Sequence, residues 1–467
     1  MTERIGIWIE SASPRILHPI WLNFRASPLS VRLAHGVFWS LIGAVLARGL
    51  GVVSSIIVAR MLGITAFGEF TMIQSTVGLF GTFAGLGLGI TATKYVAELR
   101  ETDPVRCGRI IGLILLVGMA GGLVAALALV SFAPWIATHT LAAPKLAPLL
   151  RVGATLVLFN TLQGVYSGAL GGFEAFKRVA QINWVGAVLG TPLLVLCTFA
   201  DGIRGAVWGS VLQVLLGCAI GHFALSREAV KRNVTLAFAP TNTDWRILWR
   251  FSLPVFLSEM IFSPANWIST TLLANQKAGF NEVALMNAAG QWRNIINFLP
   301  MMMTTVLVPM FSSLYQAGDQ GAYVKLLRRN LLLNAGICAA LAVPLTFCAP
   351  LVLNWYGHGF ENGVPVLRLT LLTTIIFAGT SLFGRALQAT GRAWIELLCC
   401  GIWAVTMVLG SFILVPSFKA DGLAGAQLLA TVVLAVCQCF LVRRIFSKRG
   451  FSGPSPAQAS LVAPNVN

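Results

Sequence analysis

Residues 35–60 read HGVFWSLIGAVLARGLGVVSSIIVAR, an apolar run with Arg48 deep inside it. An apolar segment of about 20 residues is long enough to cross the hydrocarbon core of a bilayer as a helix. An arginine near the centre of such a helix costs roughly 2.5–3.5 kcal/mol on insertion scales, so it usually faces a wet cavity or a partner. The run therefore predicts a membrane-spanning helix, and Arg48 is a candidate functional residue.

The composition extends this prediction to the whole chain. Of its 467 residues, 57% are hydrophobic and only 10% are charged, and the mean hydropathy is +0.80. Soluble domains carry about 25% charged residues, so the chain is predicted to be an all-α, polytopic membrane protein. The formal charge of +17 does not indicate a nucleic-acid partner, because the basic residues lie between the hydrophobic runs.

Twelve apolar segments are long enough to be transmembrane helices. They span about 35–60, 66–93, 107–133, 146–170, 179–200, 203–226, 247–273, 281–314, 330–353, 364–390, 393–416 and 421–442. Pro300 and Pro309 are expected to break or kink the eighth. The chain then divides into a leader (1–34), an N-terminal lobe of six helices (35–226), a linker (227–246), a C-terminal lobe of six helices (247–446) and a tail (447–467).

Lysine and arginine are distributed unequally between the two sides that these spans define. The even-numbered connections, with the leader and tail, hold 24 of the 33, and the odd-numbered connections hold 6. Cytoplasmic loops of membrane proteins collect lysine and arginine. We therefore expect both termini, the leader, the linker and the tail to be cytoplasmic.

An internal repeat supports the division into two lobes. The segment Ala200–Ala206 reads ADGIRGA and returns as ADGLAGA in Ala420–Ala426, each time at the turn between the last two spans of a lobe. The alternative is a chance similarity of small turn residues. A six-plus-six arrangement predicts parallel repeats, between which transporters place their substrate in a central cavity.

Polar residues share helix faces inside several of these spans. Positions three, four and seven apart lie on one side of a helix, and such polar faces include Ser55, Gln74, Glu259, Asn266, Asn287, Gln291 and Asn294. Arg293 flanks the line in the eighth span. Such faces either line a cavity or pack helices together. Arg368 lies about five residues inside its span, so it either faces the cavity or extends its side chain to the membrane surface.

Catalytic and cofactor motifs are not found in the sequence. There is no GxxxxGK[ST] loop for nucleotide hydrolysis. The nine cysteines and five histidines show no metal-ligand spacing. We therefore expect a transporter without chemistry of its own, without a cofactor and without a bound metal.

The stretch from Trp39 to Glu98 resembles a known family. It contains ARMLG at residues 59–63, FGEF at 67–70, a glycine-rich run from Gly81 to Gly89, and then Lys94 and Tyr95. These features resemble the opening of Wzx-type polysaccharide-biosynthesis flippases, which belong to the multidrug/oligosaccharidyl-lipid/polysaccharide exporter superfamily. The twelve-span layout resembles theirs over nearly the whole chain, whereas the related lipid II flippases have fourteen spans.

The resemblance implies a bacterial inner-membrane protein that moves an undecaprenyl-diphosphate-linked oligosaccharide to the periplasmic leaflet, for lipopolysaccharide or exopolysaccharide synthesis. It implies partners among membrane lipids, a polysaccharide polymerase and a chain-length regulator. Cavity cations would hold the diphosphate, which assigns this role to Arg48 and, from their position in the spans, to Arg293 and Arg368. The uncharged polar residues named above would meet the sugars, and Glu259 could couple transport to a proton.

Two other functions fit the same sequence features. One is a cation-coupled multidrug exporter of the same superfamily, which would favour several acidic residues within the membrane. The other is a scaffold of a polysaccharide polymerase complex that transports nothing.

Overall fold

The computed structural model describes residues 28–238, 241, 244–245, 252–389 and 393–446, and within these residues it is helical, with no strand. The first half of the chain forms α3 (Pro28–Gly85), α4 (Leu88–Leu99), α5 (Pro104–Trp135), η1 (Ile136–Thr140), η2 (Pro144–Leu146), α6 (Ala147–Gly172) and α7 (Phe176–Lys231). The second half forms α9 (Leu253–Ala274), α10 (Gly279–Gln316), α11 (Gln320–Phe347), α12 (Ala349–Asn354), η4 (Phe360–Gly363), α13 (Val364–Ala389) and α14 (Ala393–Phe446).

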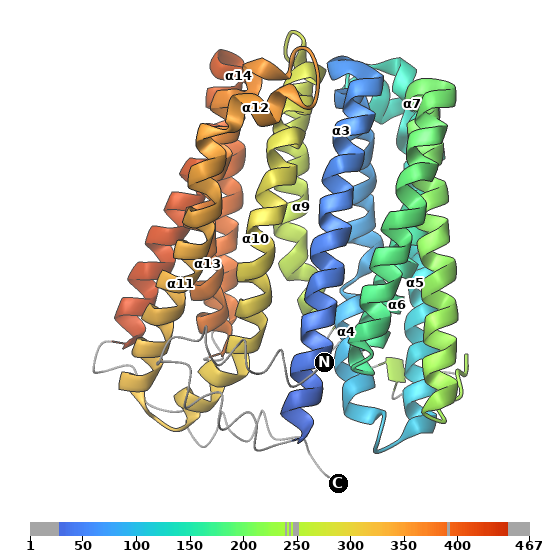
Figure 1. Ribbon diagram of the computed structural model, residues 1–467, viewed down its shortest axis with the longest axis vertical. Helices are drawn as coiled ribbons and strands as arrows, with labels where there is room; N and C mark the ends of the chain where they lie inside the picture. Colours follow the sequence, from blue (N-terminus) through green and yellow to red (C-terminus); the bar gives the residue numbers. More distant parts are fainter. Residues whose placement is uncertain (1–27, 239–240, 242–243, 246–251, 390–392, 447–467) are drawn as a thin grey trace, which may run out of the picture.

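The two halves stand side by side as separate helical bundles (Figure 1). Seven of the described helices are long and apolar enough to cross a membrane, as the composition predicts. The bundles meet where α3 packs against α9 and α10. These three helices occupy the centre of the molecule in Figure 1, so any path between the halves lies along them.

Three of the longest helices are each two helices joined at a break. The backbone leaves the helical conformation at Gly63 in α3, at Asp201 and Gly202 in α7, and at Lys419 in α14. The breaks in α7 and α14 fall at the two copies of the sequence repeat. The two breaks do not fall at equivalent positions of the repeat, however. The sequence match pairs Gly202 with Gly422, whereas the residue with positive φ in α14 is Lys419, three residues earlier.

Several helix ends differ from the sequence-based prediction. The expected second span is interrupted at Leu86 and Gly87, which have positive φ and separate α3 from α4. In contrast, α10 is one helix from Gly279 to Gln316, so Pro300 and Pro309 do not break it, and a kink at either proline stays a prediction. Prolines are tolerated within membrane helices because neighbouring helices and local adjustments satisfy the freed backbone groups. At its start α3 includes residues 28–34 of the expected leader, and α7 runs into the expected linker as far as Lys231.

The linker between the halves is fastened to α5. Asp244 is fully buried, 3.5 Å from the guanidinium nitrogens of Arg106 and of Arg109. Burial alone would raise the pKa of Asp244, but hydrogen bonds from Thr241 and the two arginines hold that pKa below its usual value. The carboxylate of Asp244 thus stays charged. Its ion pairs with Arg106 and Arg109 hold this part of the linker near the start of α5.

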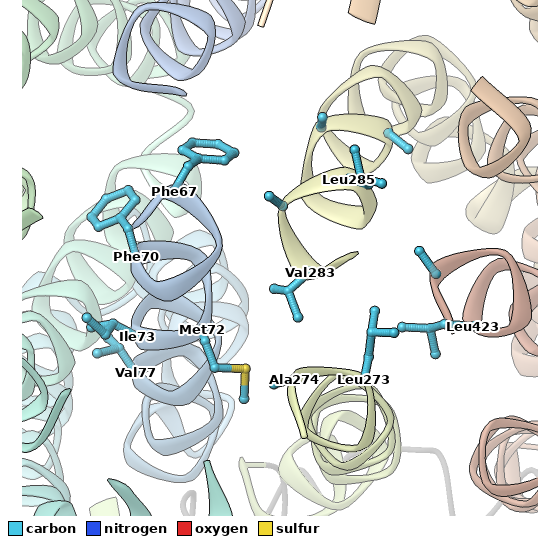
Figure 2. Close-up of a cluster of buried hydrophobic side chains, with 14 of the residues drawn as sticks. Phe67, Phe70, Met72, Ile73, Val77, Leu273, Ala274, Val283, Leu285 and Leu423 are labelled. Carbon is cyan, nitrogen blue, oxygen red and sulfur yellow. The ribbon is translucent and has the colours of Figure 1, made fainter. Parts of the chain in front are cut away.

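The largest apolar core of the described residues is shared by the two halves. In Figure 2, Phe67 and Met72 of α3 lie across from Val283 of α10 and Leu273 of α9. This cluster includes residues of both halves. Two further clusters each stay within one half, one around Leu88, Ile111 and Phe173 and the other around Phe311, Tyr323 and Leu382. The described part of the molecule is therefore sealed by apolar packing at the upper end of Figure 1 and divided into separate cores at the lower end.

Polar contacts reinforce the sealed end. Arg60 of α3 donates to the carbonyl oxygen of Trp355 at 2.7 Å, and Thr65 donates to the side-chain oxygen of Asn281 at 2.7 Å. Gly68 allows the closest approach, because a Cβ atom at this position would lie 1.8 Å from the carbonyl oxygen of Phe280. The two halves touch backbone to backbone there, so the position requires glycine.

We expect Gly68→Ala to weaken the sealed end. The added methyl group must push α3 from α10, and overpacking of this kind costs about 1–3 kcal/mol. With cysteines placed at Thr65 and Asn281, Gly68→Ala should lower the yield of the disulfide between them severalfold. Gly78→Ala is the matched control, because a Cβ atom there meets nothing within 4 Å. An equal yield in both variants would contradict the proposed close contact.

Candidate functional site

Two adjoining pockets lie where the halves meet, below the sealed core. One has a volume of ≈ 340 Å³ and the other of ≈ 410 Å³. Both are lined by Thr71 and Gln74 of α3 and by Asn287 and Gln291 of α10. These four polar side chains form the boundary between the pockets, so the pockets are two compartments of one central cavity.

Each compartment extends into one half of the molecule. The larger is walled by α3, α6 and α7, where Ser55, Asn160 and Gln213 contribute polar groups. The smaller is walled by α9, α10, α13 and α14, where Asn266 and Gln427 do so. The cavity is thus shared between the halves, and its shape must change whenever one half moves against the other.

The structure brings together all six uncharged polar residues that the sequence singles out. Ser55 lines the larger compartment, Asn266 and Asn294 line the smaller, and Gln74, Asn287 and Gln291 line both. Two of these side chains also bond within the protein: Gln74 donates to the Ser210 hydroxyl at 3.2 Å, and Asn266 donates to the Phe262 carbonyl oxygen at 2.8 Å. The stripes therefore line a cavity as well as joining helices.

Arg293 is the only charged side chain that lines either compartment in the described part of the chain. It projects from α10 into the smaller compartment and is partly buried. No described residue forms an ion pair or a hydrogen bond with its guanidinium group. A charge held away from water normally has a partner of opposite sign, so the cavity has an unmatched positive charge.

Arg48 stands at the edge of this cavity. Its neighbours Ala47 and Gly51 line the larger compartment, whereas Arg48 itself is exposed along the contact between α3 and α10. The guanidinium donates to the carbonyl oxygen of Asn294 at 3.3 Å and lies 4.4 Å from the ring centre of Phe298. Arg48 therefore contacts α10 at Asn294, the residue that follows Arg293.

Of the remaining two predicted site residues, Arg368 does not join this group. Arg368 is exposed, lines neither compartment, and lies 3.5 Å from the carbonyl oxygen of Thr346 on the neighbouring α11. Glu259 lies in α9, but its side chain falls outside the described residues. The structure thus places one of the three predicted cations inside the cavity and one at its edge.

Other polar residues of the cavity were not singled out by the sequence. Gln213 and Gln427 each lie in the last apolar span of their half, where a lone amide among apolar residues could have marked them. Buried oxygens of Ser54, Thr370 and Gln427 have no hydrogen-bond partner among the described residues. These groups need a bound molecule or water to satisfy them.

Comparison with known proteins agrees with this geometry. The model of the family described as polysaccharide biosynthesis protein matches residues 33–315, which is more than half of the chain. The EPS I polysaccharide export inner membrane protein EpsE of Ralstonia nicotianae is 24% identical over 383 residues, which cover 79% of this chain and 84% of that protein.

Solved structures show the same fold. An inward-facing multidrug resistance MATE family transporter of the MOP superfamily superposes with a TM-score of 0.70 at 15% identity, covering 89% of this chain and 96% of the other. The lipid II flippase MurJ in an inward closed conformation has a TM-score of 0.70 at 13% identity, covering 87% of each chain. The chain belongs to the polysaccharide biosynthesis protein family.

Proposed function

We propose that this protein is a flippase that moves an undecaprenyl-diphosphate-linked oligosaccharide repeat unit from the cytoplasmic to the periplasmic leaflet. The observation that carries the proposal is Arg293, the only charged side chain among the described residues that line the cavity, where it has no described partner of opposite charge. No covalent chemistry is required of the protein, because the substrate enters and leaves unchanged.

The diphosphate is the part of such a substrate that cannot cross hydrocarbon unaided. A guanidinium group is always charged and presents a planar set of donors that matches phosphate oxygens. Arg293 would therefore gain its missing partner when the substrate binds. Substrate binding would thus pair the positive charge of the cavity with the negative charge of the diphosphate.

The sugars would occupy the polar walls of the two compartments. Asn, Gln, Ser and Thr side chains both donate and accept hydrogen bonds, as hydroxyl groups of sugars do. The residues assigned to the glycan are Ser55, Gln74, Asn266, Asn287, Gln291 and Asn294.

The polyprenyl chain would remain in the membrane beside the cavity. Arg48 is exposed where α3 meets α10, and its chain neighbours line the larger compartment. We assign to it the capture of the diphosphate at this contact, before the head group passes to Arg293. Arg368, the third cation predicted for the diphosphate, has no such geometric support.

The architecture we propose is twelve crossings in two six-helix lobes related as parallel repeats. The breaks in α3, α7 and α14 supply the additional crossings within these long helices. With both termini cytoplasmic, the sealed end is periplasmic and the structure is closed to that side. Alternating access then requires the shared core at the sealed end to separate while the two separate cores at the other end approach each other.

The proposal also includes an energy source and protein partners. Glu259 in α9 is the candidate for proton coupling. A polysaccharide polymerase and a chain-length regulator are the expected partners, since they would consume the flipped repeat unit. A cation-coupled drug exporter is disfavoured, because no described acidic residue lines the cavity.

Leaflet transfer in liposomes tests the function. Purified protein should move a fluorescent diphosphate-linked oligosaccharide between leaflets, and Arg293→Gln should slow transfer at least about tenfold, as loss of one charged hydrogen bond of about 1.5–3 kcal/mol implies. Arg48→Gln should also slow it, and Arg368→Gln is the matched control, which removes an arginine outside the cavity. A drug exporter or a scaffold would show no transfer by the wild-type protein. Equal rates for the wild type and Arg293→Gln would remove the proposed site.

The unmatched charge also predicts a gain in stability. Arg293→Met removes a partly buried cation that lacks a partner, so it should raise the free energy of unfolding by about 1 kcal/mol. Arg60→Met is the comparison, because it removes an arginine that bonds across the sealed end and should lower stability. Thermal unfolding of the purified variants measures both. A loss of stability in Arg293→Met would mean that a carboxylate such as Glu259 pairs with the arginine.

A further inference from the structure

A second amphipathic site lies on the outer surface of the N-terminal bundle. A groove of ≈ 580 Å³ separates the two arms of α7. None of the residues that line this groove also lines a central compartment. The groove is lined by Arg178, Gln181, Ile182, Trp184, Val185, Ala219, Ile220, Phe223, Ala224 and Arg227. In Figure 1, α7 stands at the edge of the molecule farthest from the second half. The groove is thus separate from the proposed transport path.

The positive charges of the groove are gathered at one end. The arms of α7 run in opposite directions from the break at Asp201 and Gly202. At 1.5 Å per residue, Arg178 lies about 35 Å from the break along one arm and Arg227 about 37 Å along the other. The two guanidinium groups are therefore at the same level, near the end of the bundle where the linker begins.

Neither arginine pairs with a carboxylate in the part of the chain that the structure describes. Arg178 donates to the side-chain oxygen of Gln181 at 3.0 Å, and the guanidinium of Arg227 lies 4.2 Å from the ring centre of Phe223. These contacts hold the two side chains at the groove without neutralising either charge. An anion that reaches this end of the groove would meet both.

The rest of the groove is apolar and faces outward. Phe223 is 59% exposed and Trp184 is 44% exposed. Farther from the charged end, Val185 and Ala219 line the groove. Tryptophan is enriched where the head groups of a bilayer meet its hydrocarbon core. The groove therefore suits a molecule with an anionic head at the membrane surface and an apolar tail that follows the two arms inward.

We propose that this groove is a binding site for an anionic phospholipid of the surrounding bilayer. Arginine and phosphate form strong charge-assisted hydrogen bonds. Basic pockets between membrane helices on the cytoplasmic side are suited to anionic head groups. The phosphate would lie between Arg178 and Arg227, with an acyl chain along Val185 and Ala219. The occupant holds the two arms of α7 together from outside.

Native mass spectrometry of the full-length protein tests this site. The protein is equilibrated in detergent with equal amounts of phosphatidylglycerol and phosphatidylethanolamine, and retained lipid is identified by mass. The wild type should retain phosphatidylglycerol in preference to phosphatidylethanolamine. Arg178→Gln/Arg227→Gln should weaken this binding about 30-fold, since each basic residue contributes about a factor of five.

Two further variants separate charge from groove shape. Arg328→Gln/Arg329→Gln removes the same charge from two exposed arginines of α11 and should leave lipid binding unchanged. Ala219→Trp fills the apolar part of the groove, and it should abolish retention although both arginines remain. The arginine variants thus test binding of the lipid head group, and Ala219→Trp tests binding of the acyl chain.

Four results would overturn the proposal. They are equal loss in both arginine pairs, full binding by Ala219→Trp, displacement of the lipid by millimolar inorganic phosphate, and retention of a polyprenyl phosphate instead of a phospholipid. The third would indicate a site for free anions, and the fourth a second substrate site. Monodisperse elution of each variant shows that it has folded.

Discussion

The apolar contact between α3 and the pair α9 and α10 is the constraint on which the remaining structure depends. It joins the halves at one end, where Gly68 lets two backbones touch. At the other end each half keeps a core of its own. Separation of the halves at the shared core would leave intact the packed core that each bundle has at the other end.

The cavity is a direct consequence of that arrangement. It lies below the shared core, and its walls come from both halves, so it holds four polar residues that face both compartments. Within the membrane such groups are costly unless something satisfies them. Arg293 lines this cavity with no partner of opposite charge among the described residues, and this is the feature from which we propose an anionic occupant.

Sequence patterns predicted most of this site because helical spacing carries the required information. Positions three and four apart on α10 place Asn287, Gln291 and Asn294 on one face, and that face lines the cavity. Arg293 and Arg368 both lie inside apolar spans, and the patterns left open whether Arg368 faces the cavity or the membrane surface. What separates them is the position of each helix relative to the other half, which no local pattern records. The uninterrupted α10 was missed for a similar reason, because neighbouring helices compensate for its prolines.

The central claim is that Arg293 binds the diphosphate of the substrate. A structure that shows this contact tests the claim most directly. The measurement is a cryo-electron microscopy map of the full chain in lipid nanodiscs with excess undecaprenyl diphosphate. The account predicts density for two phosphates within hydrogen-bond distance of the Arg293 guanidinium, with the end of the cavity near Gly68 sealed. Density that joins Arg293 to a carboxylate of the protein, with no diphosphate in either compartment, would contradict it.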